Sequence, residues 1–428
     1  MLKLIMRDSW INVDLGHILV QSKEKHKPQK EEEHFYIGLE HIEKGIGELC
    51  GLNRFEKIKT VKNKFSKGQI LYGKLRPYLN KVYLAKESGV CSTDILVFQP
   101  KKEVLPKFAL QYMLSRQFVN DMSANTNGVN LPRVPTSFIN NYLFPLPPLP
   151  EQRAIVAKIE QLFSELDNGI ANLKTAKEKL KIYRQAVLKK AFEGELTNSI
   201  NRMKIIPFGE EIKIVSGNTP KGLNDISSSG NIPFYKVSDM NLPGNQIEMK
   251  CSKLVLNDND IKKLKIKIHP KGTVIFPKRG GAILTNKKRI LSKDAAFDLN
   301  LMGVIPNENY ISKYLFYFFQ LQDLGKICDG SAVPQINNKN ISPLNLPKYS
   351  LKEQNQIVEE IETRLSVCDN VLSTIEANLE KSESLRQSIL KRAFEGELLD
   401  EKELEACRKE ADWEPAEKLL ERINKEKT

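Results

Sequence analysis

The chain has 428 residues, 40% of them hydrophobic, a length that exceeds one ordinary domain and predicts several hydrophobic cores. Lysine and arginine number 66 against 53 aspartate and glutamate, and the net charge of +13 favours a polyanionic partner over an acidic small substrate. No apolar run approaches the roughly 20 residues of a membrane span, and the start is too quickly charged for a signal peptide, so we expect a cytoplasmic protein that does not contact a membrane.

Residues 1–148 form the first predicted globular domain. Alternating apolar runs at residues 70–72 and 95–98 are typical of strands, and residues 108–118 predict a short helix, so we expect a mixed α/β domain. Residues 68–74 match the spacing of a phosphate-binding loop, but Leu75 stands where that loop needs serine or threonine, and the intervening residues favour a strand. We therefore predict no ATP site here.

Basic and amide side chains in this domain are candidates for contacts with a nucleic acid. Lysine is suited to phosphates, asparagine to the edge of adenine and arginine to the edge of guanine. The candidates are three lysines ahead of the strand at residues 70–72, a denser set after it, and a later polar loop: Lys59, Lys62 and Lys64; Lys74, Arg76, Tyr78, Asn80 and Lys81; and Asn127, Asn130 and Arg133.

Residues 149–198 predict a long helix. Its apolar residues recur every seven positions with charged residues between them: Ile159, Leu166, Leu173, Leu180 and Val187. Four prolines between residues 145 and 150 resist helix propagation and mark the start of this helix. The heptad pattern is typical of a coiled coil, and an amphipathic helix packed on its own domain is the alternative.

Residues 199–348 form a second predicted α/β domain, with strands at residues 274–276 and 301–305 and a helix at residues 314–321. Residues 67–72 parallel residues 271–276 at an offset of 204, and the same offset places Asp94 opposite Asp298. The candidates for nucleic-acid contacts occupy related places: Lys263, Lys265 and Lys267; Lys278 and Arg279; and Gln335, Asn337 and Asn338.

Residues 349–400 repeat the long helix. The pair Glu151 and Gln152 returns as Glu353 and Gln354 at an offset of 202 residues, and the repeat runs without a gap to its close. The helices are therefore similar while the domains between them diverge. We expect the two helices to pair as an antiparallel coiled coil, which gives the chain a pseudo-twofold internal repeat, and a charged tail follows at residues 401–428.

No catalytic pattern emerges from the sequence. The six cysteines lie far apart without a C-x-x-C pair, and the five histidines lack metal-ligand spacing, so we expect reduced thiols and no metal site. The chain has no Asn-Pro-Pro-Tyr motif of an adenine methyltransferase and no G-x-G-x-x-G turn that opens a helix. We therefore predict a non-catalytic chain without a cofactor of its own.

The repeated helices carry a resemblance to a known family. Residues 149–156 (LPEQRAIV) and 191–196 (AFEGEL), together with their second copies, resemble the conserved regions of type I restriction–modification specificity subunits. The alternation of two such regions with two divergent domains extends the resemblance over the whole chain. The second copy departs from the pattern at Asn355, where the first has Arg153.

The resemblance implies both a fold and a function. In such proteins two α/β target-recognition domains each bind one half of a bipartite double-stranded DNA target, and the paired helices keep the halves at a fixed spacing. Two methyltransferase subunits would dock on the repeated regions, where we expect contacts from Glu151, Gln152, Glu353 and Gln354. These subunits would methylate adenine N6 with S-adenosylmethionine, and restriction subunits would add translocation and cleavage driven by ATP and magnesium.

Three other functions compete with this one. A specificity chain that serves a stand-alone methyltransferase has the same sequence features and stays open. A coiled-coil scaffold is a further alternative, but it leaves the two basic, divergent domains unexplained. An RNA-binding module is disfavoured, because the chain is only 7% aromatic and carries no RNA-binding signature.

Overall fold

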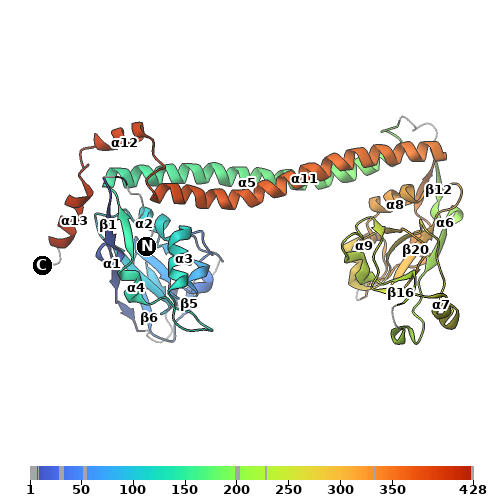
Figure 1. The fold of residues 1–428 in the computed structure, drawn as a ribbon, viewed down its shortest axis with the longest axis horizontal. Helices are drawn as coiled ribbons and strands as arrows, with labels where there is room; N and C mark the ends of the chain where they lie inside the picture. Colours follow the sequence, from blue (N-terminus) through green and yellow to red (C-terminus); the bar gives the residue numbers. More distant parts are fainter. Residues whose placement is uncertain are drawn as a thin grey trace. The chain divides into compact units, whose positions relative to one another are not determined.

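The computed structural model describes residues 7, 9–27, 33–51, 55–197, 203–226, 229–330 and 333–425. It consists of two compact units, the first comprising Met1–Leu173 with Ala377–Thr428 and the second comprising Lys174–Glu376. Each unit contains one globular domain and part of each of two long helices (Figure 1). We call the globular part ahead of the first long helix domain 1, and the part between the two long helices domain 2.

The described strands of domain 1 form three sheets. Strands β1 and β11 pair antiparallel, a four-stranded sheet has the order β2-β10-β7-β8, and a five-stranded sheet has the order β3-β6-β9-β4-β5 with β4 and β9 parallel. The bounds are β1 Ile11–Asp14, β2 Leu19–Ser22, β3 Lys25–His26, β4 Glu33–Ile37, β5 Phe55–Lys57, β6 Lys62–Phe65, β7 Ile70–Gly73, β8 Val82–Leu84, β9 Gly89–Cys91, β10 Ile95–Pro100 and β11 Leu143–Leu146.

The strands expected in domain 1 are confirmed as β7 and β10, and the segment with phosphate-loop spacing is the buried strand β7. The single helix expected at residues 108–118 is wrong, because two helices share that stretch. Ser115 begins the second of them, since its hydroxyl accepts a hydrogen bond from the Phe118 amide as an N-cap. The helices are α1 Leu15–Ile18, α2 Pro106–Met113, α3 Arg116–Ala124 and α4 Thr136–Asn140, with short 3-10 turns η1 Leu39–His41 and η2 Pro77–Leu79.

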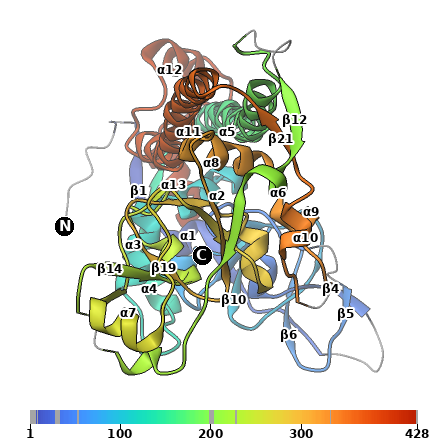
Figure 2. The same ribbon diagram turned by 90° about the vertical axis from the view of Figure 1, so that its right-hand side faces the viewer.

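Domain 2 repeats this plan with its own variations. Strands β12 and β21 pair antiparallel beside α6 (Figure 2), a five-stranded sheet has the order β13-β20-β17-β18-β15, and a three-stranded sheet has the order β16-β14-β19. The strands are β12 Lys204–Pro207, β13 Lys213–Ser216, β14 Ile232–Tyr235, β15 Glu248–Met249, β16 Leu254–Leu256, β17 Val274–Pro277, β18 Arg289–Leu291, β19 Ala296–Phe297, β20 Leu301–Ile305 and β21 Asn345–Lys348. The helices are α6 Phe208–Glu211, α7 Asp258–Leu264, α8 Ser312–Leu321, α9 Leu324–Ile327 and α10 Asn338–Ile341, with 3-10 turns that include η6 Gly280–Thr285.

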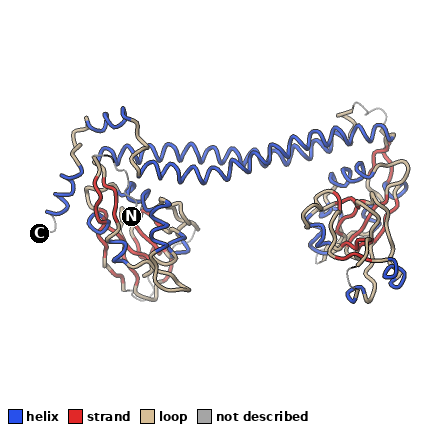
Figure 3. Tube along the Cα trace, viewed as in Figure 1, coloured by secondary structure: helices blue, strands red, loops and turns tan. Residues whose placement is uncertain are grey.

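Two 44-residue helices, α5 (Leu149–Phe192) and α11 (Leu351–Phe394), pair along each other, with strands confined to the globular domains (Figure 3). In the first unit the start of α5 packs on the end of α11, where Ile159 and Ile389 share one core. In the second unit the end of α5 packs on the start of α11, where Leu188 and Ile361 share another. The pairing is therefore antiparallel, as expected from the sequence.

Ion pairs between the two long helices follow the twofold repeat. Arg184 pairs with Asp369 in the second unit, and Arg386 pairs with Asp167 in the first. The arginines correspond at the offset of 202 residues, and so do the aspartates. The same contact is therefore made once in each unit, which confirms the pseudo-twofold character of the helix pair.

The segment after α11 is helical and packs on the first unit. It contains α12 (Glu401–Arg408) and α13 (Ala416–Lys425), whose Leu404, Leu419 and Ile423 are buried in the core of that unit. Lys158 of α5 binds Glu403 with 2.8 Å between Nζ and Oε1. The charged tail expected from the sequence thus has an amphipathic structure, because its apolar residues recur at helical spacing.

Candidate nucleic-acid interface

In domain 1, three segments that are distant in sequence are joined by main-chain hydrogen bonds. The Lys74 amide donates to the Asp94 carbonyl (3.0 Å), the Arg76 amide to the Pro132 carbonyl (2.7 Å), and the Val134 amide to the Lys74 carbonyl (3.1 Å). We call residues 74–80, 92–94 and 127–134 loop cluster 1. It brings together Lys74, Arg76, Tyr78, Asn80, Asn127, Asn130 and Arg133 from the predicted set.

Domain 2 builds the same arrangement from related segments. The Lys278 amide donates to the Asn300 carbonyl (2.8 Å), the Gly280 amide to the Pro334 carbonyl (2.8 Å), and the Ile336 amide to the Lys278 carbonyl (2.9 Å). We call the described part of residues 278–286, 298–300 and 329–338 loop cluster 2. It brings together Lys278, Arg279, Gln335, Asn337 and Asn338, so part of the predicted set of each domain lies in a matched cluster.

The counterpart of Asp94 differs from the sequence-based prediction. Gly73 of β7 lies opposite Ile95 of β10, and the related Pro277 of β17 lies opposite Leu301 of β20. The residue that precedes Leu301 is Asn300, so Asp94 corresponds to Asn300 and the pairing with Asp298 is wrong. The reason is a two-residue insertion in domain 2 between the strands, which the sequence offset of 204 does not include.

The side chains of the two clusters differ in charge. In loop cluster 1 the Arg133 guanidinium donates from Nε and Nη2 to the two carboxylate oxygens of Asp94, at 3.0 and 3.2 Å. This bond holds the pKa of Asp94 below its ordinary value. Arg133 also donates from Nη1 to the Leu131 carbonyl (3.4 Å), so its planar donor set is used largely within the cluster.

Loop cluster 2 replaces this ion pair with neutral groups. Gln335 corresponds to Arg133, since each exchanges two main-chain hydrogen bonds with the residue six positions earlier. The Gln335 side-chain amide donates to Asn337 (3.1 Å), and Asn300 donates to Asp298 (3.1 Å). Burial raises the pKa of Asp298. Lys278 donates from Nζ to the Ser216 hydroxyl (3.1 Å), and burial lowers the pKa of its ammonium group.

Asn80 of loop cluster 1 and the adjacent Lys81 have internal roles. Asn80 is buried, and its backbone is left-handed with φ 43°. Lys81 donates from Nζ to the Leu39 carbonyl. Tyr78, by contrast, is 51% exposed and presents its ring at the surface. The dense set predicted at residues 74–81 therefore divides into exposed side chains and side chains that support the turn.

The three lysines ahead of β7 lie on or beside the sheet that contains β6. Lys62 stands over the Tyr36 ring at 5.2 Å, Lys64 is 3.8 Å from Glu24, and Lys59 is exposed in the preceding turn. The side chain of Asn63 donates to the Ile95 carbonyl (2.9 Å), one residue beyond Asp94. This contact places β6 next to loop cluster 1.

The three lysines predicted ahead of β17 in domain 2 lie on a different layer from loop cluster 2. Lys263 is in α7, Lys265 follows the end of that helix, and Lys267 comes two residues later, all three exposed. Helix α7 packs with β14 and β16 in its own apolar cluster. Within the described residues, no hydrogen bond or ion pair joins these lysines to loop cluster 2, so the two basic runs occupy different structural settings.

The glutamines expected to bind partner subunits are buried inside this chain. Gln152 accepts a hydrogen bond from the Leu105 amide (2.7 Å) and donates to the carbonyls of Glu103 (3.0 Å) and Pro147 (2.9 Å). Gln354 repeats all three contacts with the Ile311 amide (3.0 Å) and the carbonyls of Asn309 (2.7 Å) and Tyr349 (2.9 Å). Both side chains have no exposed surface, so each clamps its long helix to its domain and offers no atom to a partner.

The neighbouring glutamates differ between the repeats. Glu151 is buried and accepts a hydrogen bond from the Trp10 indole nitrogen at 2.7 Å. Glu353 is half-buried and accepts from the hydroxyl of Ser350 at 2.7 Å. The repeated Glu-Gln pair was the signal for these contacts in the sequence, but it carried no information about which groups they bind.

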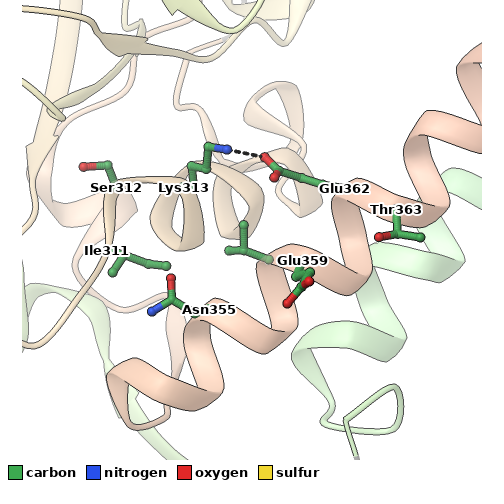
Figure 4. Close-up of a pocket in the computed structure, with 8 residues that line it drawn as sticks. Ile311, Ser312, Lys313, Asn355, Glu359, Glu362 and Thr363 are labelled. Atoms are coloured by element: carbon green, nitrogen blue, oxygen red, sulfur yellow. Dashed lines mark ion pairs between the residues drawn. The ribbon is translucent and has the colours of Figure 1, made fainter.

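A groove of about 530 Å³ lies between α8 and the start of α11 in the second unit, lined by residues that include Ile311, Asn355 and Thr363. Lys313 pairs with Glu362 across it at 2.8 Å (Figure 4). The first unit has the same ion pair between Lys107 and Glu160 at 2.7 Å. Because both units carry the pair, it fastens each domain to its long helix.

Neither a metal site nor a membrane span occurs within the part of the chain that the structure describes. There, no group of three or more histidine, cysteine, aspartate or glutamate side chains is placed to hold a metal ion. No described helix combines the length and the apolar character that a membrane crossing requires.

Sequence comparison links this arrangement to known proteins. A family model described as a type I restriction modification DNA specificity domain matches residues 8–175 and 203–381. The chain is similar to the type I restriction enzyme EcoDI specificity subunit of Escherichia coli, with 34% identity over 164 residues that cover 38% of this chain and 36% of that protein. It is also similar to the EcoKI specificity subunit of Escherichia coli strain K12, with 23% identity over 323 residues that cover 71% of this chain and 68% of that protein.

Solved structures share the fold at low sequence identity. The HsdS subunit from Thermoanaerobacter tengcongensis has a TM-score of 0.63 and 21% identity, with 92% of this chain and 98% of that chain covered. A chain from a structure concerned with complex assembly and conformational transition of the type I R-M system has a TM-score of 0.73 and 20% identity, with 92% and 99% covered. The likeness shows that two mixed α/β domains joined by a helix pair recur in these proteins.

Proposed function

This chain belongs to the family of type I restriction–modification specificity subunits, and we propose that domains 1 and 2 each bind one half of a bipartite double-stranded DNA target. The observation that carries this proposal is the pair of loop clusters. Their main-chain hydrogen bonds are the same, while their side chains differ at the positions of Arg133 and Asp94. A shared backbone frame with different polar groups suits two readers that dock on the same duplex form and recognise different bases.

Six lysines contribute binding strength without sequence preference in this proposal. Phosphate contacts position a protein on DNA and depend on salt, whereas base edges specify the sequence. The phosphate-binding set comprises Lys59, Lys62 and Lys64 in domain 1, and Lys263, Lys265 and Lys267 in domain 2. The loop clusters and the adjacent Lys81 supply the remaining predicted DNA contacts.

The reactions belong to partner subunits. Two methyltransferase subunits would bind this chain and use S-adenosylmethionine to methylate adenine N6, and restriction subunits would use ATP and magnesium to cleave DNA. The chain itself would be non-catalytic. The antiparallel helix pair supports two partners, because it repeats the same helix–helix contact, Arg184–Asp369 and Arg386–Asp167, about a pseudo-twofold axis.

The buried clamps Gln152 and Gln354 leave the partner contacts to other residues. Large apolar side chains are exposed on the long helices, among them Ile182 (70%), Val367 (60%) and Leu385 (51%). Exposed apolar groups on a helix face are suited to a second helix. We place the partner contacts on these faces, with half-buried Glu353 at the edge.

The test is to reconstitute the chain with the methyltransferase subunits of its own system and to map methylated adenines in genomic DNA. We expect one bipartite sequence, and no methylation by the isolated chain. Exchanging residues 1–145 for those of a relative should then change one half-site alone. Methyl transfer by the isolated chain, or a change in both half-sites, would contradict the proposal.

A further inference from the structure

One arginine of loop cluster 1 has an unusual backbone conformation. Arg76 has a φ of 50°, in the left-handed region that residues other than glycine, asparagine and aspartate rarely adopt. The other described non-glycine residues with positive φ are Asn80, Asn286 and Lys265. Asparagine tolerates this region, and Lys265 follows the end of α7, where left-handed residues commonly terminate a helix. Arg76 has neither of these local reasons.

Domain 2 supplies an internal control for this position. Gly280 has a φ of 71° and donates its amide to Pro334, just as Arg76 donates its amide to Pro132. The 3-10 turn that follows Arg76 and the one that begins at Gly280 each end at a left-handed asparagine, Asn80 or Asn286. The fold therefore accepts glycine here, and nothing in the backbone frame calls for an arginine in domain 1.

The side chain of Arg76 is available for binding. It is exposed, and within the described residues it makes no hydrogen bond or ion pair. Arg133, the other arginine of loop cluster 1, is held by Asp94 and the Leu131 carbonyl. Arg76 is therefore the guanidinium that this cluster presents with its donors free.

We propose that Arg76 is a base-reading residue of domain 1 and recognises a guanine in the half-site of that domain, an inference that rests on the proposed function. Strained conformations persist where function requires them. The sugar-phosphate backbone is the same in both halves of a target, so a phosphate contact at this position would serve both domains equally. Domain 2 has Gly280 in place of this arginine. Arg76 therefore serves a feature that differs between the two halves of the target, which is the base sequence. The left-handed backbone sets the direction in which the Cα–Cβ bond of Arg76 leaves the turn, and the planar guanidinium supplies the pair of donors that a bidentate contact with guanine requires.

Two substitutions at Arg76 test the proposal in the reconstituted complex. Arg76→Gly should keep or raise the melting temperature, because glycine adopts this conformation without strain. It should nevertheless lose discrimination at one base pair of a single half-site, by about 10- to 100-fold in binding to matched against mismatched duplex. Arg76→Lys keeps the positive charge but lacks the planar pair of donors, so it should retain the salt dependence of the parent and still lose that discrimination.

The matched control is Lys402→Gln, which removes one exposed positive charge from α12. It should leave both half-sites unchanged. If Arg76→Gly weakens all sequences equally and Arg76→Lys restores binding, Arg76 contacts a phosphate and the proposal is wrong. If both variants read the parental half-sites with parental discrimination, Arg76 does not read a base, although the proposed function stands. Failure of the parental complex to bind a specific sequence would refute the proposed function itself.

Discussion

Loop clusters 1 and 2 are built on one backbone plan and differ in their chemistry. The same three main-chain hydrogen bonds join the segments of each cluster, yet one contains the Arg133–Asp94 ion pair and the other the neutral groups Gln335 and Asn300. The frame is thus fixed by packing, while the groups that face outward are free to vary. This difference is what the proposed recognition of two different half-sites requires. The predictions below test where the two halves are equal and where they differ.

The largest effect is expected at the buried clamps, where the two halves are the same. Gln152→Ala and Gln354→Ala each leave one part-buried amide and two carbonyls without their partner, which should destabilise the affected unit by about 2–4 kcal/mol. Hydrogen exchange should locate the damage, with the Leu105 amide losing protection in the first variant and the Ile311 amide in the second. Asn355→Ala, at an exposed position one residue after Gln354, is the control. Equal loss of protection in the control would show that the loss does not come from the missing clamp.

The next effect is a pH dependence of stability that is expected in domain 2 and not in domain 1. Lys288 of domain 2 is fully buried, and burial lowers its pKa from 10.5 to about 7. Leu84 pairs with Ile70 of β7, and Ile290 pairs with Val274, the counterpart of Ile70 in β17. Lys288 lies two residues before Ile290, and the residue two before Leu84 is Val82. Val82 therefore occupies the position of Lys288 in domain 1. A lysine with a lowered folded pKa binds fewer protons than in the unfolded chain, so stability rises with pH between about 7 and 10.5.

The stability of the second unit should therefore increase by at most about 1.4 kcal/mol per pH unit in that window. Lys288→Met should abolish this pH dependence of stability. The first unit should lack it, because Val82 at the corresponding position does not titrate. The measurement is denaturant unfolding followed at several pH values with a probe in each unit. A slope that persists in the variant would assign the effect to another group.

A third comparison concerns the two basic runs. Replacing Lys59, Lys62 and Lys64 by glutamine should weaken binding to all duplexes and make the dependence of log K on log salt shallower by about 0.9 for each phosphate that the variant no longer neutralises. The matching replacement of Lys263, Lys265 and Lys267 should act in the same direction. Titrations at several salt concentrations with specific and unrelated duplexes provide the measurement. A change in the recognised sequence without a change in salt slope would show that these lysines read bases.

The smallest effect is an acid sensitivity of the Arg133–Asp94 ion pair in loop cluster 1. Arg133 lowers the pKa of Asp94, so the stabilising ion pair is complete above the ordinary carboxyl pKa of about 3.9 and is lost as the pH falls through the lower folded value. Loop cluster 2 has Asn300 at this position and should lack this step; its own acid-sensitive carboxyl is Asp329, whose pKa is lowered by the hydrogen bond with Lys339. Asp94→Asn should remove the acid-dependent step from domain 1, as followed by the side-chain resonances of Arg133. An unchanged titration in that variant would rule out Asp94 as its source.

Several features of this protein follow from the sequence by itself. The offset of 202 residues between the Glu-Gln pairs, the heptad spacing and the alternating strands predicted two related halves and an antiparallel helix pair. Such patterns are readable because periodicity reports which face of a helix or strand is apolar, a property of residues close together in the chain. The same local character explains why the segment at residues 68–74 was recognised as a strand.

Other features were decided by the tertiary structure. The Gln152 clamp joins groups as much as 49 residues apart, and Arg133 meets Asp94 across 39 residues. Nothing local distinguishes a glutamine that binds buried backbone from one that meets a partner, or an arginine held by aspartate from one left free. The insertion that makes Asn300 the counterpart of Asp94 was likewise visible only once the strands were paired. Hydrogen bonds of this kind depend on which segments packing brings together, and a linear pattern does not contain that information.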